Sequence, residues 1–186
     1  MRATDYSQMT SALRRKKESG NTIVELALIL TPMMALLLAI VELSLPIFKK
    51  STFVSAVREG CRYGITYQTL YNGTNYASQT AAIKAVVQAN AMGFLSDPSM
   101  IYVKYYNPTS SPTPFTDVTG GGTGVANADG NIIEVSVQGY THTWMVPANW
   151  SYGTTSFQVT NTSLPIIAMS ADRLESLPVG SARPAP

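Results

Sequence analysis

The chain has 186 residues, a formal net charge of +2 and 13% charged residues. This low charge argues against a nucleic-acid-binding domain, which concentrates Lys and Arg on one face. Cys61 is the only cysteine, so an internal disulfide is excluded, and the sequence has no Cys/His spacing typical of a metal site. The length suits one membrane anchor followed by one small domain with a modest core.

The first 20 residues end in a basic cluster, Arg14 to Lys17, and the small pair Ser19-Gly20. We expect residues 1–19 to be an unstructured leader. Positive charge beside a membrane segment stays in the cytoplasm, so the cluster favours a cytoplasmic N-terminus. Lys49 and Lys50 lie just beyond the apolar run that follows, but four cations precede that run and only two follow it directly.

Residues 23–48 form a long apolar run with Glu25 near its start. A membrane-spanning helix needs about 20 mostly apolar residues, whereas the apolar part of a secretory signal has only ~7–15. The run therefore predicts a helix that begins near Asn21 or Thr22 and crosses a membrane over about residues 22–48.

Pro32 interrupts this predicted helix. It removes one backbone hydrogen bond and should kink the helix, and the hydroxyl of Thr31 is placed to satisfy a freed carbonyl. The kink is either a bend without a role or a flexible point during extraction from the membrane.

Glu25 is the one acid near the start of the run. A carboxylate inside the hydrocarbon costs about 2.5–3.5 kcal/mol and usually has a partner. No Lys or Arg lies one helical turn away, and the nearest cations are on the other side of Gly20. A cut after Gly20 would create a charged amine on Asn21, four residues before Glu25.

The segment combines a basic leader ending in Gly, a valine–glutamate pair, an apolar run broken by Pro, a second acid and an Arg-containing helix. The residues concerned are Gly20, Val24-Glu25, Pro32, Glu42 and 57–64. This order resembles that of type IV-like prepilins, and more narrowly that of TadE/TadF-like minor pilins of the tight-adherence (Tad, Flp) pilus. The resemblance covers about residues 14–66, and the choice between the TadE and TadF types stays open.

The resemblance implies a single-pass protein of the bacterial inner membrane with its head in the periplasm or outside. A prepilin peptidase would cut between Gly20 and Asn21, which removes the leader, residues 1–20. Glu25 would then pair with the amine of Asn21 on its own or a neighbouring chain. The implied partners are the peptidase, other pilins through the N-terminal helix, and the pilus assembly platform, and the implied role is in pilus biogenesis and adhesion. The alternatives are a type II secretion pseudopilin and a membrane-anchored binding or enzyme domain unrelated to pili.

The remaining sequence predicts an α+β fold: a long N-terminal helix over 21–70, then a small head over 71–177 of one helix packed on a 3–4 stranded antiparallel sheet. Gly60 and Gly64 should allow the head to pack closely on the helix. Apolar spacing predicts the head helix at 75–94, and period-two alternation predicts strands. The strands are expected at 100–106, 131–143, 157–160 and 165–174, with an exposed loop at 107–130 and a loose tail at 178–186.

No catalytic constellation is evident. His142, the only histidine, stands between two threonines and should face solvent, and no orienting acid is apparent for a Ser-His-Asp arrangement. Gly120 to Gly122 has no phosphate-loop Lys after it.

Cys61 beside Gly60 is expected to be a small packing residue rather than to form an intermolecular disulfide. The sequence has ten tyrosines and two tryptophans. We expect these side chains to pack a sheet against a helix rather than to form a carbohydrate-binding surface. We therefore expect neither an enzyme nor a cofactor.

Overall fold

The computed structural model describes residues 3–108, 115–144, 149–152, 155–158, 163–178 and 180–186, with backbone only for 3–21, 149–152 and 155–158. The chain forms two compact units, residues 1–44 and 45–186. The described elements are a long helix, a second helix, a short 3-10 helix (Pro98–Met100) and antiparallel sheets of two to four strands. The predicted α+β class is confirmed.

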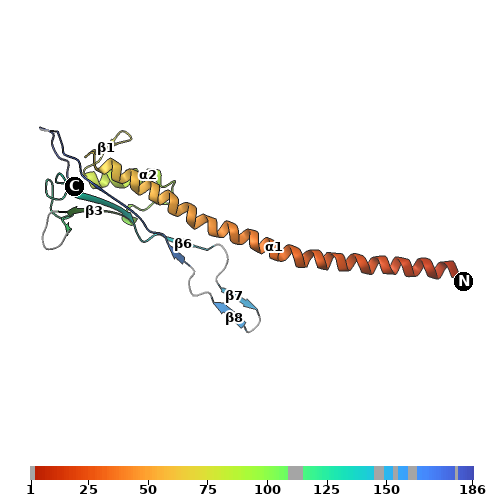
Figure 1. Cartoon of the computed structure of the whole chain (residues 1–186). Coiled ribbons are helices and arrows are strands. Elements are labelled where there is room, and N and C mark those ends of the chain that lie inside the picture. Colours follow the sequence, from red (N-terminus) through yellow and green to blue (C-terminus); the bar gives the residue numbers. More distant parts are fainter. Residues whose placement is uncertain (1–2, 109–114, 145–148, 153–154, 159–162, 179) are drawn as a thin grey trace. The chain divides into compact units, whose positions relative to one another are not determined.

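The first helix, α1, extends from Ala3 to Gly64 and therefore passes through both units (Figure 1). The prediction of an unstructured leader and a helix start near Asn21 is wrong, because the backbone is already helical from Ala3. The leader holds no Pro or Gly before Gly20, and one Gly inside a helix costs only about 1 kcal/mol. The helix ends a few residues earlier than predicted, before a turn in which Tyr67 has φ 55°.

The second helix, α2, spans Gln79–Asn90 and is shorter than the predicted 75–94. Ser78 caps its start, since the side chain accepts a hydrogen bond from the Ala81 N–H at 3.1 Å. Before α2, the short strands β1 (Leu70–Tyr71) and β2 (Thr74–Asn75) form a hairpin. Its turn is Asn72-Gly73, where both residues have positive φ, as this dipeptide predicts.

The main sheet of the head has four antiparallel strands in the order β10-β5-β3-β4. Their bounds are Ala168–Arg173 for β10, Ile132–Val137 for β5, Ile101–Asn107 for β3 and Thr116–Asp117 for β4. The central pair β3 and β5 is in register with Val103 opposite Val135. The segment 107–130 therefore connects two neighbouring strands, and β4 lies within it.

The predicted strand 131–143 is two strands, because the chain leaves the sheet at Gly139 with φ 78°. After β5, β6 (Thr141–Thr143) pairs with β9 (Ser163–Pro165) instead. A separate hairpin joins β7 (Asn149–Tyr152) and β8 (Thr155–Gln158). Of the predicted strand 157–160, residues 159–160 lie outside the described residues.

The core of the head lies between the sheet and the C-terminal part of α1. The inward faces of β3 and β5 are buried as the alternation predicts, and α1 and α2 each contribute an apolar stripe. The residues concerned are Ile101, Val103, Tyr105, Ile133, Val135 and Val137 from the sheet, Phe53, Ala56, Val57 and Cys61 from α1, and Ile83 and Val87 from α2. Cys61 is 2% exposed, which agrees with its predicted role as a packing residue.

Gly60 and Gly64 lie where α1 approaches the rest of the head most closely. A Cβ atom at Gly64 would stand 2.7 Å from Ile133 Cδ1, and one at Gly60 would overlap the side chain of Val87. The predicted close packing is thus confirmed, since any side chain at these positions would displace the sheet or α2.

The C-terminal residues, predicted as a loose tail, are tied to the head by polar contacts. Arg183 Nη2 lies 2.7 Å from Asp129 Oδ1. Asn127 Nδ2 donates to the Pro184 carbonyl at 2.9 Å, and the Gln79 N–H donates to the Ala185 carbonyl at 2.8 Å. We call residues 183–185 the C-terminal clasp.

Candidate anchor and assembly segment

The N-terminal part of α1 exposes every side chain that the structure describes. From Thr22 to Val41 no residue is buried, and Leu28 is 75% exposed. The apolar side chains surround the helix, which is typical of a segment buried in a large core or in a membrane. The helix is long and apolar enough over Thr22–Gly64 to cross a membrane, as the sequence predicts for about 22–48.

Pro32 lies within the continuous helix, and its neighbour Thr31 makes a hydrogen bond different from the expected one. The Thr31 hydroxyl donates to the Ala27 carbonyl at 2.8 Å. The carbonyl that Pro32 leaves without its N–H partner belongs to Leu28, so the predicted compensation is wrong. Hydroxyl bonds of this kind to the preceding turn tend to bend helices, which adds to the bend expected from Pro32.

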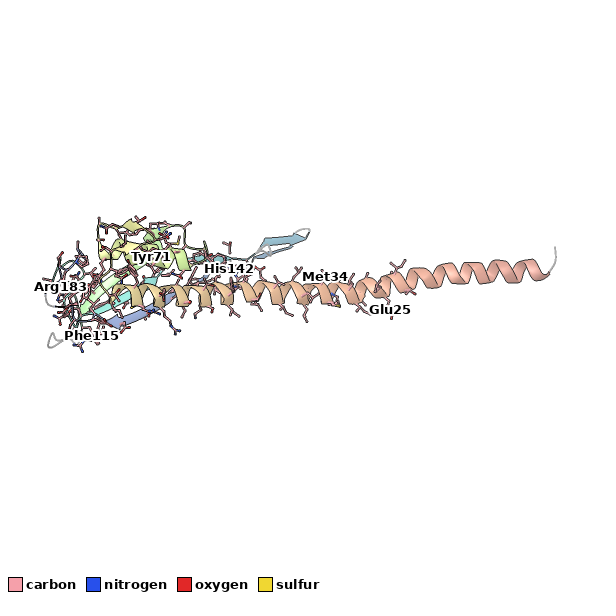
Figure 2. All side chains as sticks on the ribbon, turned by 90° about the horizontal axis from the view of Figure 1, so that it is seen from above. Glu25, Met34, Tyr71, Phe115, His142 and Arg183 are labelled. Atoms are coloured by element: carbon pink, nitrogen blue, oxygen red, sulfur yellow. The ribbon has the colours of Figure 1, made fainter. Side chains whose placement is uncertain are left out.

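The two acids of the apolar segment have different surroundings. Glu25 is exposed and projects from the helix surface, as does Met34 nine residues later (Figure 2). It forms no ion pair with any residue whose side chain is described. Glu42 is only 8% exposed. Both acids belong to the sequence pattern of the resemblance, and that pattern did not predict the difference in their exposure.

Gly20 and Asn21, the predicted cleavage site, lie within the helical backbone of α1. The Asn21 side chain lies outside the described part. The pairing of Glu25 with an amine on Asn21 therefore stays a prediction. Residues four apart on a helix are neighbours on one face. The helical backbone therefore places Asn21 and Glu25 one turn apart.

Beyond the apolar run, Lys49 is held by an aromatic cluster in the head. Its Nζ lies 5.4 Å from the ring centroids of both Phe94 and Tyr140. It also lies 3.2 Å from His142 Nδ1. Of the two cations that follow the run, one is thus engaged by the head, which the charge count along the sequence did not reveal.

His142 is 3% exposed, so the prediction that it faces solvent is wrong. Its flanking threonines are exposed, whereas the imidazole points inward and packs edge-on against Trp144 at 5.4 Å. An ammonium group only donates hydrogen bonds, so Nδ1 accepts from Lys49 and the ring proton is on Nε2. Nε2 is buried and has no partner among the described residues. An imidazole that faces a lysine instead of an acid lacks the orienting group of a catalytic triad.

A shallow groove crosses the outer face of the sheet. Its lining is mostly apolar and comes from Tyr106, Phe115, Ile132 and Ala171, with Glu134 as its one carboxylate. Within the part of the chain that the structure describes, no group of three or more His, Cys, Asp or Glu residues is placed to hold a metal ion.

A membrane-capable helix and a small α+β head together define a membrane-anchored protein with one extramembrane domain. Residues 20–62 match the model of the family described as TadE-like protein. The resemblance seen in the sequence is therefore confirmed over this segment, which is similar to TadE-like proteins. Comparison with curated proteins and with solved structures gave no match.

The matched segment begins at Gly20, the residue predicted to precede the cut, and ends at Arg62 in the head part of α1. It contains Glu25, Pro32 and Glu42, so the family model and the predicted site residues fall on the same stretch.

Proposed function

We propose that this protein is a minor pilin of a Tad-type, type IV-like pilus, with a structural role in pilus assembly and adhesion. The observation that carries the proposal is the TadE-like match over residues 20–62, which begins at the predicted cleavage residue. The apolar surface of α1 from Thr22 to Val41 supports it. That surface suits a lipid bilayer before assembly and a bundle of pilin helices after it. The head would be a structural domain in the periplasm or outside the cell and not an enzyme.

The first step would be hydrolysis of the Gly20–Asn21 peptide bond by a prepilin peptidase of the inner membrane. Water adds across the bond, which leaves a carboxylate on Gly20 and a charged amine on Asn21. Gly20 is the weakest helical residue of this region, since Gly destabilises a helix interior by about 1 kcal/mol relative to Ala. Local opening for the peptidase would therefore be easiest there.

Mass spectrometry of the membrane-extracted protein tests this step. We expect a mature chain of 166 residues, the 186 of the sequence less the 20 of the leader. Gly20→Leu should block the cut and serves as the control. An unprocessed N-terminus in cells with an active peptidase would refute the proposal.

Glu25 would then neutralise the new amine of Asn21, on its own or a neighbouring chain. Four residues of helix rise about 6 Å, so both groups lie at nearly the same depth. Pairing removes most of the cost of a carboxylate in hydrocarbon and would set the axial offset between neighbouring subunits. Other pilins would pack through this helix, with the assembly platform as a further partner.

Glu25→Gln should leave cleavage intact and block incorporation into fibres, as measured by the pilin content of sheared pili. The matched control is Glu59→Gln, an exposed acid on the head part of the same helix, which should change neither. Normal incorporation of the Glu25 variant would contradict the pairing role while leaving the cleavage result untouched.

A further inference from the structure

One end of the head is built around Phe48 and Lys49, where the apolar run of α1 stops. The Phe94 ring lies edge-on to Phe48 at 6.2 Å and accepts the Lys49 ammonium on its face. Strand β6 reaches the same place through His142, 3.2 Å from Lys49. The loop after α2 and strand β6 therefore meet α1 where its apolar run ends.

Met92, at the tip of the loop after α2, has an unusual conformation and an unusual exposure. Its φ is +53°, a region that side chains other than Asn, Asp and Gly seldom adopt. Its side chain is 69% exposed. Two other described non-glycine residues have a similar φ, Tyr67 at 55°, which is buried, and Asn72 at 48°, which is polar. Met92 therefore presents an apolar side chain at the surface of the head.

Two further apolar side chains lie beside His142. Trp144 packs its ring against the imidazole at 5.4 Å. Leu164 is the register partner of His142 on β9 and is 40% exposed. Phe48 itself is 50% exposed. Aromatic rings, exposed aliphatic side chains and lysines occur together where proteins meet the headgroup layer of a membrane.

We propose that this end of the head, comprising Phe48, Lys49, Met92, Trp144 and Leu164, rests in the interfacial layer of the bilayer that α1 crosses. The inference rests on the membrane anchor of the proposed function. Met92 and Leu164 would contact the upper acyl chains, and the neighbouring Lys50 would face lipid phosphates.

Continuity of the chain sets the depth of this surface. The run 23–48 is about 39 Å long as a helix, against a hydrocarbon thickness of about 30 Å. Phe48 therefore lies at or just beyond the hydrocarbon boundary when the run spans the membrane. The ring of Phe94 packs on Phe48, and Met92 is two residues away along the chain. Phe94 and Met92 therefore lie close to the same hydrocarbon boundary as Phe48.

Nitroxide labels on the full-length chain in phosphatidylcholine–phosphatidylglycerol vesicles test the depth. Single labels at Met92→Cys and Leu164→Cys report on the proposed surface. Asn72→Cys is the matched control, because it is also an exposed loop tip with positive φ. It lies beside Tyr71, whose ring packs on Tyr63, fifteen residues along α1 from Phe48. Leu36→Cys reports on the anchor. Cys61 is retained, since at 2% exposure it is shielded from the label, and wild-type protein measures any background.

We expect the labels at Met92 and Leu164 to be several-fold more accessible to oxygen, relative to a water-soluble nickel complex, than the label at Asn72. If both report water like Asn72 while Leu36 reports hydrocarbon, the inference is overturned and the anchor stands. If Leu36 also reports water, the anchor fails and the inference fails with it. Shielding of both surface labels from both reagents would mean a protein contact, which also overturns the inference.

Discussion

The two parts of α1 both carry apolar side chains, but these side chains are exposed in one part and buried in the other. From Thr22 to Val41 the side chains are exposed all round the helix, whereas from Phe53 to Cys61 the apolar ones are buried on one face. The head part spaces its apolar residues by three and four positions with charged residues between them, and the anchor part does not. One-sided spacing indicates a helix that packs on its own domain, and apolar residues all round indicate a helix that needs an outside apolar environment.

The two parts therefore depend on different surroundings. The head is stabilised by contacts within residues 45–186, so its stability should be the same in any mild detergent. The described side chains of the anchor part are exposed from Thr22 to Val41, so its free energy depends on lipid or on neighbouring helices. Substitutions in one part should leave the other unchanged, which makes the comparison testable.

The largest effect is expected from Phe53→Ala in the head part. Phe53 is fully buried, and its ring contacts those of Tyr140 at 4.9 Å and Phe94 at 6.5 Å. Removing a buried phenyl ring costs about 3–5 kcal/mol. Denaturation of the full chain in detergent micelles should show this loss, while membrane association persists. Phe115→Ala, the same change at a 55% exposed site, should cost far less, and equal losses would contradict the assignment of the core.

Next is Leu36→Lys in the anchor part. A lysine at the centre of a membrane helix costs about 2.5–3.5 kcal/mol on insertion scales, so the variant should shift from the membrane to the soluble or degraded fraction. The fold of any recovered head should be unchanged by near-UV circular dichroism. Ser55→Lys, at an exposed position on the head part of α1, should remain in the membrane. Unimpaired insertion of the Leu36 variant would place the membrane segment elsewhere.

Periodicity predicted the class of fold and most of its elements. The inward faces of β3 and β5 follow from alternation, and the apolar stripe of α2 follows from helical spacing, because burial of one face imposes these periods. The extent of the elements was less predictable. The leader is helical because nothing before Gly20 breaks it, and 131–143 divides because Gly139 takes a positive φ, which apolar spacing does not report.

Polar contacts between distant residues were not predictable from local pattern. His142 is flanked by exposed threonines, and only the fold brings Lys49, 93 positions earlier, to its ring. The C-terminal clasp likewise depends on Asp129 and Asn127 being in reach of Arg183. The segment from Gly20 to Glu42, in contrast, was recognised from sequence alone, because its resemblance depends on the order of residues along the chain and not on contacts between distant ones.

The C-terminal clasp gives a smaller expected effect within the head. Arg183 Nη2 pairs with Asp129, its Nη1 donates to the Asn127 carbonyl at 2.6 Å, and its guanidinium lies 5.7 Å from the Tyr67 ring centroid. Arg183→Ala should destabilise the head by about 1–2 kcal/mol. The loss lies toward the lower end of this range because solvent partly screens the exposed ion pair. Protease treatment should release the C-terminal residues sooner than in wild type. Arg62→Ala, at an exposed position, is the control, and no difference between the two would mean that the clasp adds nothing to stability.

A further expected effect is a pH dependence confined to the head. Burial, with a contribution from Asp172, raises the pKa of the Cys61 thiol from 9.0 to about 11. Between these values the unfolded thiol loses its proton and the native one keeps it, so stability falls as pH rises, by at most about 1.4 kcal/mol per pH unit and less where solvent screens the thiolate. Burial and Asp129 also raise the pKa of Tyr67 to about 12, which extends the decline above pH 10.

Denaturation of wild type and Cys61→Ala from pH 8 to 11 separates the two groups, since the variant should lose only the thiol part of the slope. Parallel curves would mean that Cys61 ionises equally in both states, and the native thiol would then be open to alkylation, contrary to its position in the core.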